Sequence, residues 1–417
     1  MKSRFGLAWI VAALFAGAIV GDLVTGWLVI HVVELSGGQR QTRPPVAQQD
    51  LLKLRGASDE QSDIEIRTMH GRLMERIKAE YDRYLVGERK EPPVINLLVI
   101  SSGGDYGAFG AGFLKGWQKV PPQHPLAKPE FDVVTGVSAG TLIAPFAFLG
   151  DEQSIDEIAN LFRSPDKDWV RQRGFLYFLP DNISFAEVPG LEREVRDYIT
   201  IEELRRVAKA GAQGRILAVN TTNLDKGTSR VFNLVAEAQR AVDSGQLDRF
   251  RSIILASAGI PGVFPFRIID GGLYVDGGIT GNIIYGGRGE EDDKLPAMWQ
   301  KAYPSLAIPK IRIWVIFNNQ LRSLPEITAP NWPTVVRRSL ETATRASTAT
   351  ALRHLYAMAE IARLRREADV EVRVASIPDD WSPPALGTFA KETMNSLVDL
   401  GEKMGADPSS WSTSLPR

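Results

Sequence analysis

The chain has 417 residues, 44% of them hydrophobic, which is long enough for one large α/β domain or two smaller domains. Its formal net charge of -1 gives no electrostatic argument for binding nucleic acid, and we expect no nucleic-acid partner. The absence of cysteine excludes disulfides, thiol nucleophiles, cysteine-ligated metals and the acylated cysteine of a lipoprotein.

An apolar run extends from about residue 5 to residue 33, after two basic residues. It exceeds the roughly 20 residues that span a bilayer, so residues 1–35 are predicted to be a membrane anchor. A cleaved signal sequence is the alternative, because Ala16-Gly17-Ala18 gives an A-x-A pattern. We favour the anchor, since the apolar run continues well beyond this pattern. The flanking basic residues favour a cytoplasmic amino terminus, and hence a membrane-associated protein with an extracytoplasmic body.

Residues 36–93 separate this segment from the predicted catalytic domain at residues 94–417. Ser36 to about Asp50 is polar, with glycine and proline, and is typical of a linker. Residues 60 to 88 carry apolar side chains at helical spacing, which predicts an amphipathic helix.

A glycine-rich turn follows the first predicted strand of that domain. Val94 to Ile100 is a short apolar run that suits a buried parallel strand. Ser101 to Gly107 reads S-S-G-G-D-Y-G, and a helical pattern continues to Trp117. Glycines permit positive φ and the close approach of an anion, so the backbone N–H groups can receive a phosphate or an oxyanion. The turn alone does not decide between them.

A second strand, turn and helix indicate a nucleophile. Phe131 to Thr135 is a short apolar strand, and Gly136-Val137-Ser138-Ala139-Gly140 follows before another helical pattern. This is the G-x-S-x-G nucleophile elbow, in which Gly136 and Gly140 are expected to allow the sharp turn that exposes the Ser138 side chain.

The base that would activate Ser138 is harder to find, because the chain has only four histidines and none lies in the usual context of a catalytic histidine. Ser138, Asp276 and His354 have the chain order of an α/β-hydrolase triad, and this remains an alternative. His354 lies inside a long predicted helix, whereas a triad histidine is expected on a loop after a strand. The other three histidines lie in the apolar run, before the domain and in a proline-rich loop.

A later motif supplies a carboxylate instead. Residues 256 to 265 read A-S-x-x-I-P-x-V-F-P, and Asp276-Gly277-Gly278 follows at the end of a predicted strand. Together with the glycine-rich turn and the elbow, these elements resemble the patatin-like phospholipase family over about residues 94 to 285. Asp270-Gly271-Gly272 is interpreted as the turn before that strand.

The resemblance implies a lipid acyl hydrolase that works through an acyl-enzyme. Ser138 would be the nucleophile and Asp276 the carboxylate that activates it directly. The backbone N–H groups of Gly103, Gly104 and Asp105 would form the oxyanion hole. No cofactor and no metal are expected. Two positions depart from the family pattern G-G-G-x-R/K-G, because Ser102 replaces the first glycine and Tyr106 the basic residue.

The remaining sequence completes the predicted fold. Strands are expected at Ile311–Phe317 and Val370–Ile377, and helices at Ser339–Arg366 and Thr388–Lys403. This alternation predicts a three-layer α/β/α patatin-like domain with a mostly parallel central sheet. Residues 286 to 310 are predicted to be an exposed loop.

An aromatic-rich insert between Trp169 and Phe185, together with the anchor, favours a lipid ester substrate and contact with a membrane. Three other functions stay open: a catalytically silent lipid-binding scaffold, an acyltransferase, and a nucleotide-binding module. The last has no Walker lysine and an incomplete glycine spacing.

Overall fold

The computed structural model describes residue 43 and residues 46–165, 168–173, 183–286, 294–322, 325–385 and 387–414, without the side chains of residues 332 and 333. The predicted anchor or signal sequence at residues 1–35 lies outside the described residues. Among the residues that are described, no helix is long and apolar enough to cross a membrane.

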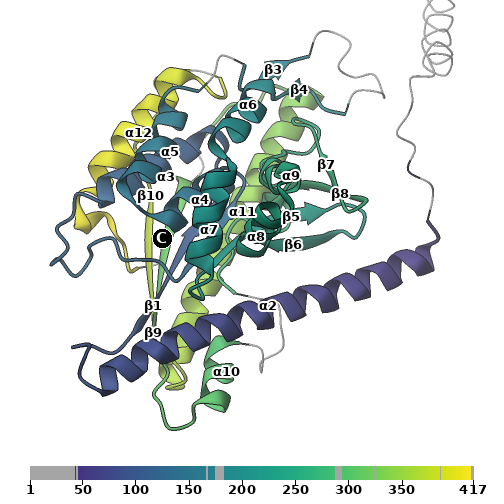
Figure 1. Ribbon diagram of the computed structural model, residues 1–417. Coiled ribbons are helices and arrows are strands. Elements are labelled where there is room, and N and C mark those ends of the chain that lie inside the picture. The colour runs from purple at the N-terminus through teal and green to yellow at the C-terminus, as the bar shows by residue number, and fades with distance from the viewer. Residues whose placement is uncertain are drawn as a thin grey trace, which may run out of the picture.

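A mostly parallel sheet forms the centre of the molecule (Figure 1). The parallel strands, in the order in which they neighbour one another, are β10 (Val370–Ile377), β9 (Lys310–Gln320), β1 (Val94–Ile100), β2 (Val133–Val137) and β5 (Ile216–Asn223). Antiparallel pairing adds β6 (Thr228–Asn233), β7 (Arg267–Ile269) and β8 (Gly272–Asp276). The expected α/β fold with a mostly parallel sheet is confirmed.

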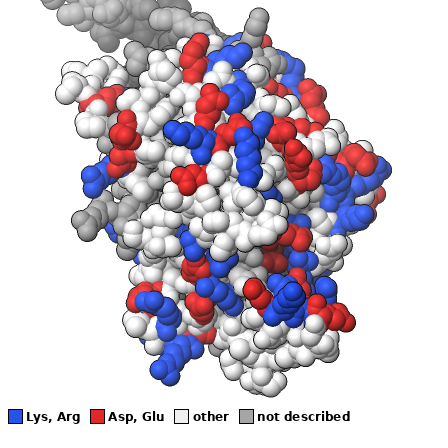
Figure 2. All heavy atoms as spheres, turned by 90° about the vertical axis from the view of Figure 1, so that its left-hand side faces the viewer, with Lys and Arg blue, Asp and Glu red and all other residues white. Residues whose placement is uncertain are grey.

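One face of the sheet is covered by a large group of helices. They are α3 (Gly107–Trp117), α4 (Ala139–Leu149), α5 (Glu152–Arg163), α6 (Pro189–Tyr198), α7 (Ile201–Gly211), α8 (Leu234–Ser244), α9 (Asp248–Ser257) and α12 (Lys391–Gly405). Their apolar faces share one core with strand residues such as Leu98, Ile100 and Trp314, all fully buried. Figure 2 views the side on which α3, α5 and α12 lie and shows basic and acidic side chains interspersed, as the near-zero net charge leads one to expect.

The pair α3 and α12 packs with its backbones almost in contact. A Cβ atom built at Gly116 would lie 2.0 Å from the carbonyl oxygen of Glu402, and one at Gly405 would lie 2.1 Å from that of Phe113. Side chains at these two positions would force the helices apart. The helix that follows the glycine-rich turn is thereby fixed to the C-terminal helix of the chain.

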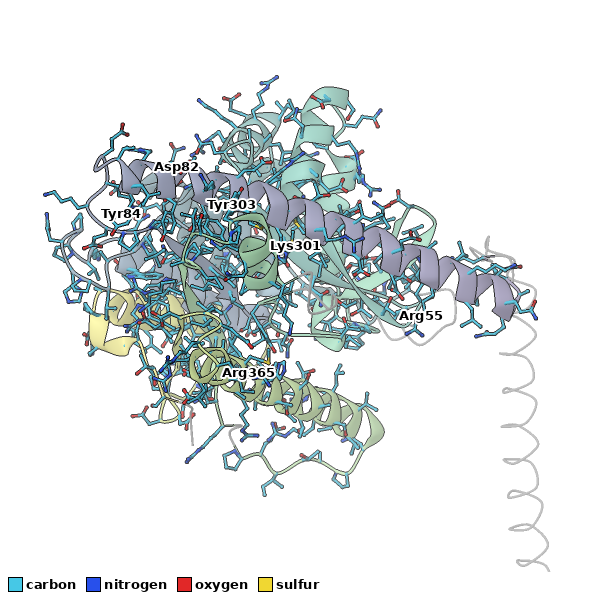
Figure 3. The ribbon with its side chains drawn as sticks, turned by 90° about the horizontal axis from the view of Figure 1, so that it is seen from below. Arg55, Asp82, Tyr84, Lys301, Tyr303 and Arg365 are labelled. Carbon is cyan, nitrogen blue, oxygen red and sulfur yellow. The ribbon has the colours of Figure 1, made fainter. Side chains whose placement is uncertain are left out.

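The opposite face is covered by α11 (Trp332–Leu364), α2 (Gln48–Leu85) and α10 (Leu295–Ala302). Leu97 and Val99 of β1 pack with α11, whereas Ile95 packs with α2. Seen from this side, α2 runs across the molecule with α10 beside it (Figure 3). Its buried residues lie between Met69 and Tyr81, while its first turns extend past the domain (Figure 1).

Three boundaries differ from the sequence prediction. Helix α2 begins at Gln48, so the last residues of the predicted linker are helical. Residues 286 to 310 are not all exposed loop, because α10 forms there and buries Trp299 against Tyr81. Helix α11 begins at Trp332, since the side chain of Asn331 accepts a hydrogen bond from the Thr334 N–H and caps its first turn. A short hairpin of β3 (Arg171–Gln172) and β4 (Ala186–Glu187) was not predicted.

Candidate active site

Ser138 lies between the end of β2 and the start of α4, with φ 54° and ψ -120°. This conformation is rare for a residue with a side chain and is typically found at functional sites. Neither Gly136 nor Gly140 has positive φ. A Cβ atom at Gly140 would lie 2.3 Å from the carbonyl oxygen of Ile100, and one at Gly136 would lie 2.4 Å from that of Gly140. The serine therefore makes the sharp turn itself, and the glycines allow the elbow to approach β1. This corrects the role that we predicted for them.

The register of β5 explains why Ser138 meets Asp276. Asn220 of β5 pairs with Val137, the last residue of β2, and the next β5 residue, Thr221, pairs with Asp276. Because β6 occupies the other edge of β5 from Ala218 to Asn223, β8 must use the same edge as β2. Strand β8 thus takes over the edge where β2 ends.

The side chains of Ser138 and Asp276 are joined by a hydrogen bond in the interior. The Ser138 hydroxyl donates to Asp276 Oδ2 at 2.6 Å, and the backbone N–H of Gly278 donates to Asp276 Oδ1 at 2.7 Å. The two residues are only 4% and 6% exposed. Burial raises the pKa of Asp276 to about 6, although both donors lower it in part. At neutral pH the carboxylate is ionised and is a stronger base than an exposed one.

A buried hydroxyl holds the elbow to its neighbours. Ser257 of α9 accepts a hydrogen bond from the Ser138 backbone N–H at 3.1 Å and donates to the Asn220 carbonyl at 2.6 Å. Its Oγ also lies 2.6 Å from the Thr141 hydroxyl. Ser257 belongs to the A-S-x-x-I-P motif, but nothing local in the sequence indicates that α9 meets the elbow, so this role was not predicted.

The backbone of Asp276 is fixed separately from its carboxylate. Its N–H donates to the Gly259 carbonyl at 2.8 Å, and its own carbonyl accepts from the Thr222 hydroxyl at 2.9 Å. The Asn220 side chain donates to the carbonyls of Gly277 and Gly281, at 2.8 and 3.1 Å. The D-G-G turn therefore rests on β5, the strand that also positions Ser138.

The glycine-rich turn lies beside the elbow at the same edge of the sheet. A Cβ atom at Gly107 would lie 2.7 Å from the Ala139 Cβ, and one at Gly103 would lie 2.6 Å from the Asn318 carbonyl oxygen. Gly104 has φ +58°, which only glycine adopts readily. Asn318, which we did not predict as a site residue, donates to Ser101 Oγ from its backbone and to the Ser101 carbonyl from its side chain. The end of β9 thus supports this turn.

Asp105, the third predicted donor of the oxyanion hole, has a buried carboxylate. Burial raises its pKa, while the backbone N–H groups of Phe389, Asp105 and Tyr106 lower it in part. The Phe389 N–H donates to Asp105 Oδ2 at 3.0 Å. The Asp105 N–H already has a partner in its own carboxylate.

Aromatic rings from four segments pack against one another around this turn. Tyr106 meets Trp381 with ring centroids 5.5 Å apart, and Phe389 contacts Trp169 at 6.0 Å and Phe264 at 5.9 Å. Trp169 belongs to the predicted aromatic insert, of which residues 174–182 lie outside the described residues. Burial and the Asp105 charge raise the pKa of Tyr106, whereas Arg345 lowers it. Arg345 is itself paired with Glu341 at 3.1 Å, and the Glu341 charge also raises the pKa of Tyr106.

His354 does not join the pair. It is exposed on α11, where its Nδ1 lies 2.7 Å from the Tyr285 hydroxyl, whereas the Asp276 carboxylate accepts from Ser138 and Gly278. In the parts of the chain that the structure describes, no three histidine, aspartate or glutamate residues are grouped so that they could hold a metal ion.

A serine elbow and a glycine-rich turn at one edge of a mostly parallel sheet place the chain in the class of α/β proteins with a nucleophile elbow. Residues 98–286 match the family model of the patatin-like phospholipases, so this part of the chain is similar to a patatin-like phospholipase domain. The predicted resemblance is confirmed, and the family supports lipid acyl hydrolase activity in general.

Two further comparisons add little. No curated protein sequence matches the chain. Among solved structures, VipD from Legionella pneumophila is similar, with 12% identity and a TM-score of 0.35 over 77% of this chain and 68% of that one. A likeness at this level supports no argument about activity.

Proposed function

We propose that the protein hydrolyses carboxylic esters of lipids through Ser138 and Asp276, with no catalytic histidine. The observation that carries the proposal is the 2.6 Å hydrogen bond between their buried side chains. A candidate base must lie within such reach of the proton that it removes. Within the described residues, this carboxylate is the only side-chain group that forms a hydrogen bond with the Ser138 hydroxyl.

In the first half of the reaction, Ser138 Oγ attacks the ester carbonyl carbon as its proton passes to Asp276 Oδ2. The backbone N–H groups of Gly103 and Gly104 donate to the oxyanion that forms. The bond between the carbonyl carbon and the alkoxy oxygen then breaks, and the leaving alcohol takes the proton from Asp276. The acyl group remains on Ser138.

In the second half, Asp276 takes a proton from a water molecule that attacks the acyl carbon. The ester bond to Ser138 breaks, the proton returns to Oγ, and a fatty acid leaves. Burial supports both halves, since the raised pKa of Asp276 makes it a better proton acceptor. The oxyanion donors contribute a large share of the transition-state stabilisation, because removing one such donor typically costs about 2.7–4 kcal/mol of it.

We also propose that the apolar run of residues 5–33 holds the protein at a membrane, where its lipid substrate is found. The aromatic rings that pack around the neighbouring glycine-rich turn support a lipid substrate.

The test is fluorophosphonate labelling of the detergent-solubilised protein together with fatty acid release from phospholipid. We expect Ser138→Ala to lose labelling and Asp276→Asn to lose at least about 10³-fold in fatty acid release. His354→Ala is the matched control and should keep both. Selective loss with His354→Ala would indicate the triad instead. A wild-type protein that neither labels nor releases fatty acid would indicate a lipid-binding scaffold.

A further inference from the structure

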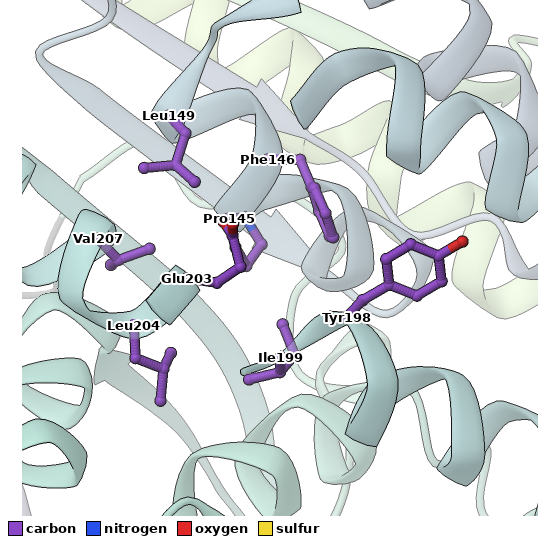
Figure 4. A pocket seen from close by; sticks show the side chains of 8 residues that line it. All are labelled: Pro145, Phe146, Leu149, Tyr198, Ile199, Glu203, Leu204 and Val207. Carbon is purple, nitrogen blue, oxygen red and sulfur yellow. The ribbon is translucent and has the colours of Figure 1, made fainter. Parts of the chain in front are cut away.

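Ser138 lines neither of the two small hollows that lie beside α4. The one in Figure 4 is lined mainly by side chains of α4 and α7, and the second adjoins it. Neither hollow relates the proposed oxyanion donors to the dyad. That relation depends instead on contacts between the glycine-rich turn and the loop that follows Asp276.

One buried side chain, that of Asn282, connects these two segments. It follows Asp276 by six residues and is 2% exposed. The Ser102 hydroxyl donates to Asn282 Oδ1 at 2.6 Å, and the Ser102 N–H donates to the Asn282 carbonyl at 3.4 Å. Ser102 directly precedes Gly103, the first of the proposed oxyanion donors. Two hydrogen bonds therefore hold the start of the turn to the loop of the base.

The amide oxygen of Asn282 also lies against Gly278. A Cβ atom built at Gly278 would lie 2.6 Å from Asn282 Oδ1 and 3.0 Å from Asp276 Oδ1. The Gly278 backbone thus fits between the two oxygens, and its N–H donates to Asp276 Oδ1. Asn282 therefore contacts both the residue that orients the base and the residue that precedes the oxyanion donors.

Helix α11 fixes the orientation of the Asn282 amide. Its Nδ2 donates to the Thr344 carbonyl at 3.0 Å and to the Thr348 hydroxyl. The carbonyl can only accept, and the Thr348 hydroxyl gives its own proton to that carbonyl at 2.9 Å. Because neither group can donate to the amide, the amide nitrogen must face α11. The oxygen is thereby left to accept from Ser102.

The backbone on either side of Asn282 is held independently of this side chain. The Asn220 side chain donates to the Gly281 carbonyl at 3.1 Å, and the Thr135 hydroxyl donates to the Ile284 carbonyl at 2.7 Å. Truncating Asn282 therefore leaves the loop attached to β5 and β2. What the truncation removes is the link between that loop and the glycine-rich turn.

We propose that Ser102 and Asn282 are positioning residues that align the oxyanion donors with the dyad. A hydroxyl at position 102 supplies a hydrogen bond that a glycine there cannot make. The proposal rests on the proposed function, in which Gly103 and Gly104 donate to the oxyanion. Because the oxyanion exists only after Ser138 attacks, misaligned donors should lower kcat and leave KM nearly unchanged.

The experiment measures kcat and KM for p-nitrophenyl butyrate, with active sites counted by fluorophosphonate labelling carried to completion. Ser102→Ala removes the hydroxyl, and we expect kcat per labelled site to fall about 10–100-fold with KM unchanged within about twofold. Ser102→Thr keeps a hydroxyl and should recover most of that loss. Ser154→Ala is the matched control, because this buried hydroxyl donates to Asp151 at 2.8 Å, outside both segments, and it should keep the wild-type kcat.

Asn282→Ala is a second variant, which removes the acceptor of the Ser102 hydroxyl. Its kcat should fall by a similar factor, and adding Ser102→Ala should lower kcat no more than about twofold further, because both changes break the same link. The midpoint of the pH profile should equal that of the wild type, since Gly278 still donates to Asp276.

Two results would overturn the inference while leaving the dyad intact: a folded, labelled Ser102→Ala protein with the wild-type kcat, or losses that multiply in the double variant. If Asn282→Ala fails to fold, Ser102→Ala and its threonine rescue decide alone. A wild-type protein that neither labels nor hydrolyses the ester would overturn the proposed function instead.

Discussion

The Ser138–Asp276 pair places an ionised carboxylate in a largely buried position. Asp276 is 6% exposed, and its carboxylate oxygens accept from the Ser138 hydroxyl and the Gly278 N–H. Burial disfavours the charged form by more than these donors favour it, which is why the pKa rises to about 6. Two consequences can be measured at this one residue.

The first consequence is an acidic limit on activity. Only the ionised form of Asp276 accepts the serine proton, so kcat/KM should rise with pH through an apparent pKa near 6 and then level off. An Asp with an ordinary pKa would instead give a constant rate above about pH 5. The measurement is a pH profile for a short soluble ester, with circular dichroism confirming the fold at each pH. A midpoint near pH 4 would contradict the assignment.

The second consequence is a stability penalty above pH 6. Because the folded pKa is higher than the unfolded value of 3.8, the folded state binds the proton more tightly, and stability falls as pH rises from about 4 to 6. The Asp276→Asn protein has no carboxyl group to ionise at this position, so it does not lose stability as pH rises. Its amide oxygen can accept from the Gly278 N–H while its amide nitrogen donates to the Ser138 hydroxyl. It should be more stable than wild type at pH 8, by at most on the order of 3 kcal/mol, and this advantage should shrink towards pH 4. Urea unfolding at the two pH values measures it, and an equal advantage at both would contradict the explanation.

The sequence predicted this pair but not the residues that hold it. Ser138 and Asp276 lie in motifs whose spacing along the chain is distinctive. Ser257, Asn220 and Asn318 lie on three different elements and meet the site only through the packing of those elements. No local pattern marks such residues, so they become visible only in three dimensions.

At the scale of elements, the nucleophile elbow depends on how closely α4 approaches β1. The missing side chain at Gly140 allows this approach, since a Cβ atom there would collide with the Ile100 carbonyl oxygen. Gly71 in α2 is the opposite case, because nothing lies within 4 Å of its Cβ position. Gly71→Ala is therefore a suitable control for Gly140→Ala.

Gly140→Ala should destabilise the protein by about 1–3 kcal/mol, through overpacking, and abolish fluorophosphonate labelling. Gly71→Ala should stabilise it by about 0.5–1 kcal/mol, because alanine favours a helix interior, and should leave labelling intact. Denaturant unfolding and labelling of both proteins provide the comparison. A Gly140→Ala protein that labels like the wild type would show that the close approach is dispensable.

Elements with a strong periodic pattern were predicted well, including β1, β10 and the helices flanking both motifs. Helix α10 was missed because it has eight residues, follows an acidic stretch and owes its burial to Trp299 alone. The start of α11 was missed because its first turns expose Val335 and Val336 and show no buried face. In these places tertiary contact or capping, and not local pattern, defines the element.

At the scale of the whole molecule, the folding unit is larger than the matched patatin-like region. Strand β9 lies between β10 and β1, in the interior of the sheet, although it follows residue 286 in the chain. Helices α2, α11 and α12 also lie outside residues 98–286 and cover both faces. A fragment of residues 98–286 would expose an edge of β1 and apolar side chains on both faces of the sheet.

We therefore expect residues 98–286 alone to show no cooperative thermal unfolding and to aggregate, whereas residues 46–414 should unfold cooperatively. Circular dichroism and scanning calorimetry of the two fragments test this. Cooperative unfolding of the shorter fragment would show that the domain folds without α2, α11, α12 and β9.

The interior position of β9 also sets an order of events during synthesis. At roughly 5–20 residues per second, about 10–40 s pass between the synthesis of Ile100 and that of Lys310. Throughout that interval the nascent chain has an open strand edge for a chaperone to shield. Ser138 and Asp276 both leave the ribosome before Asn318, which supports the glycine-rich turn, so the nucleophile exists before its oxyanion donors are set. The proposed esterase activity should therefore begin only when translation has passed β9.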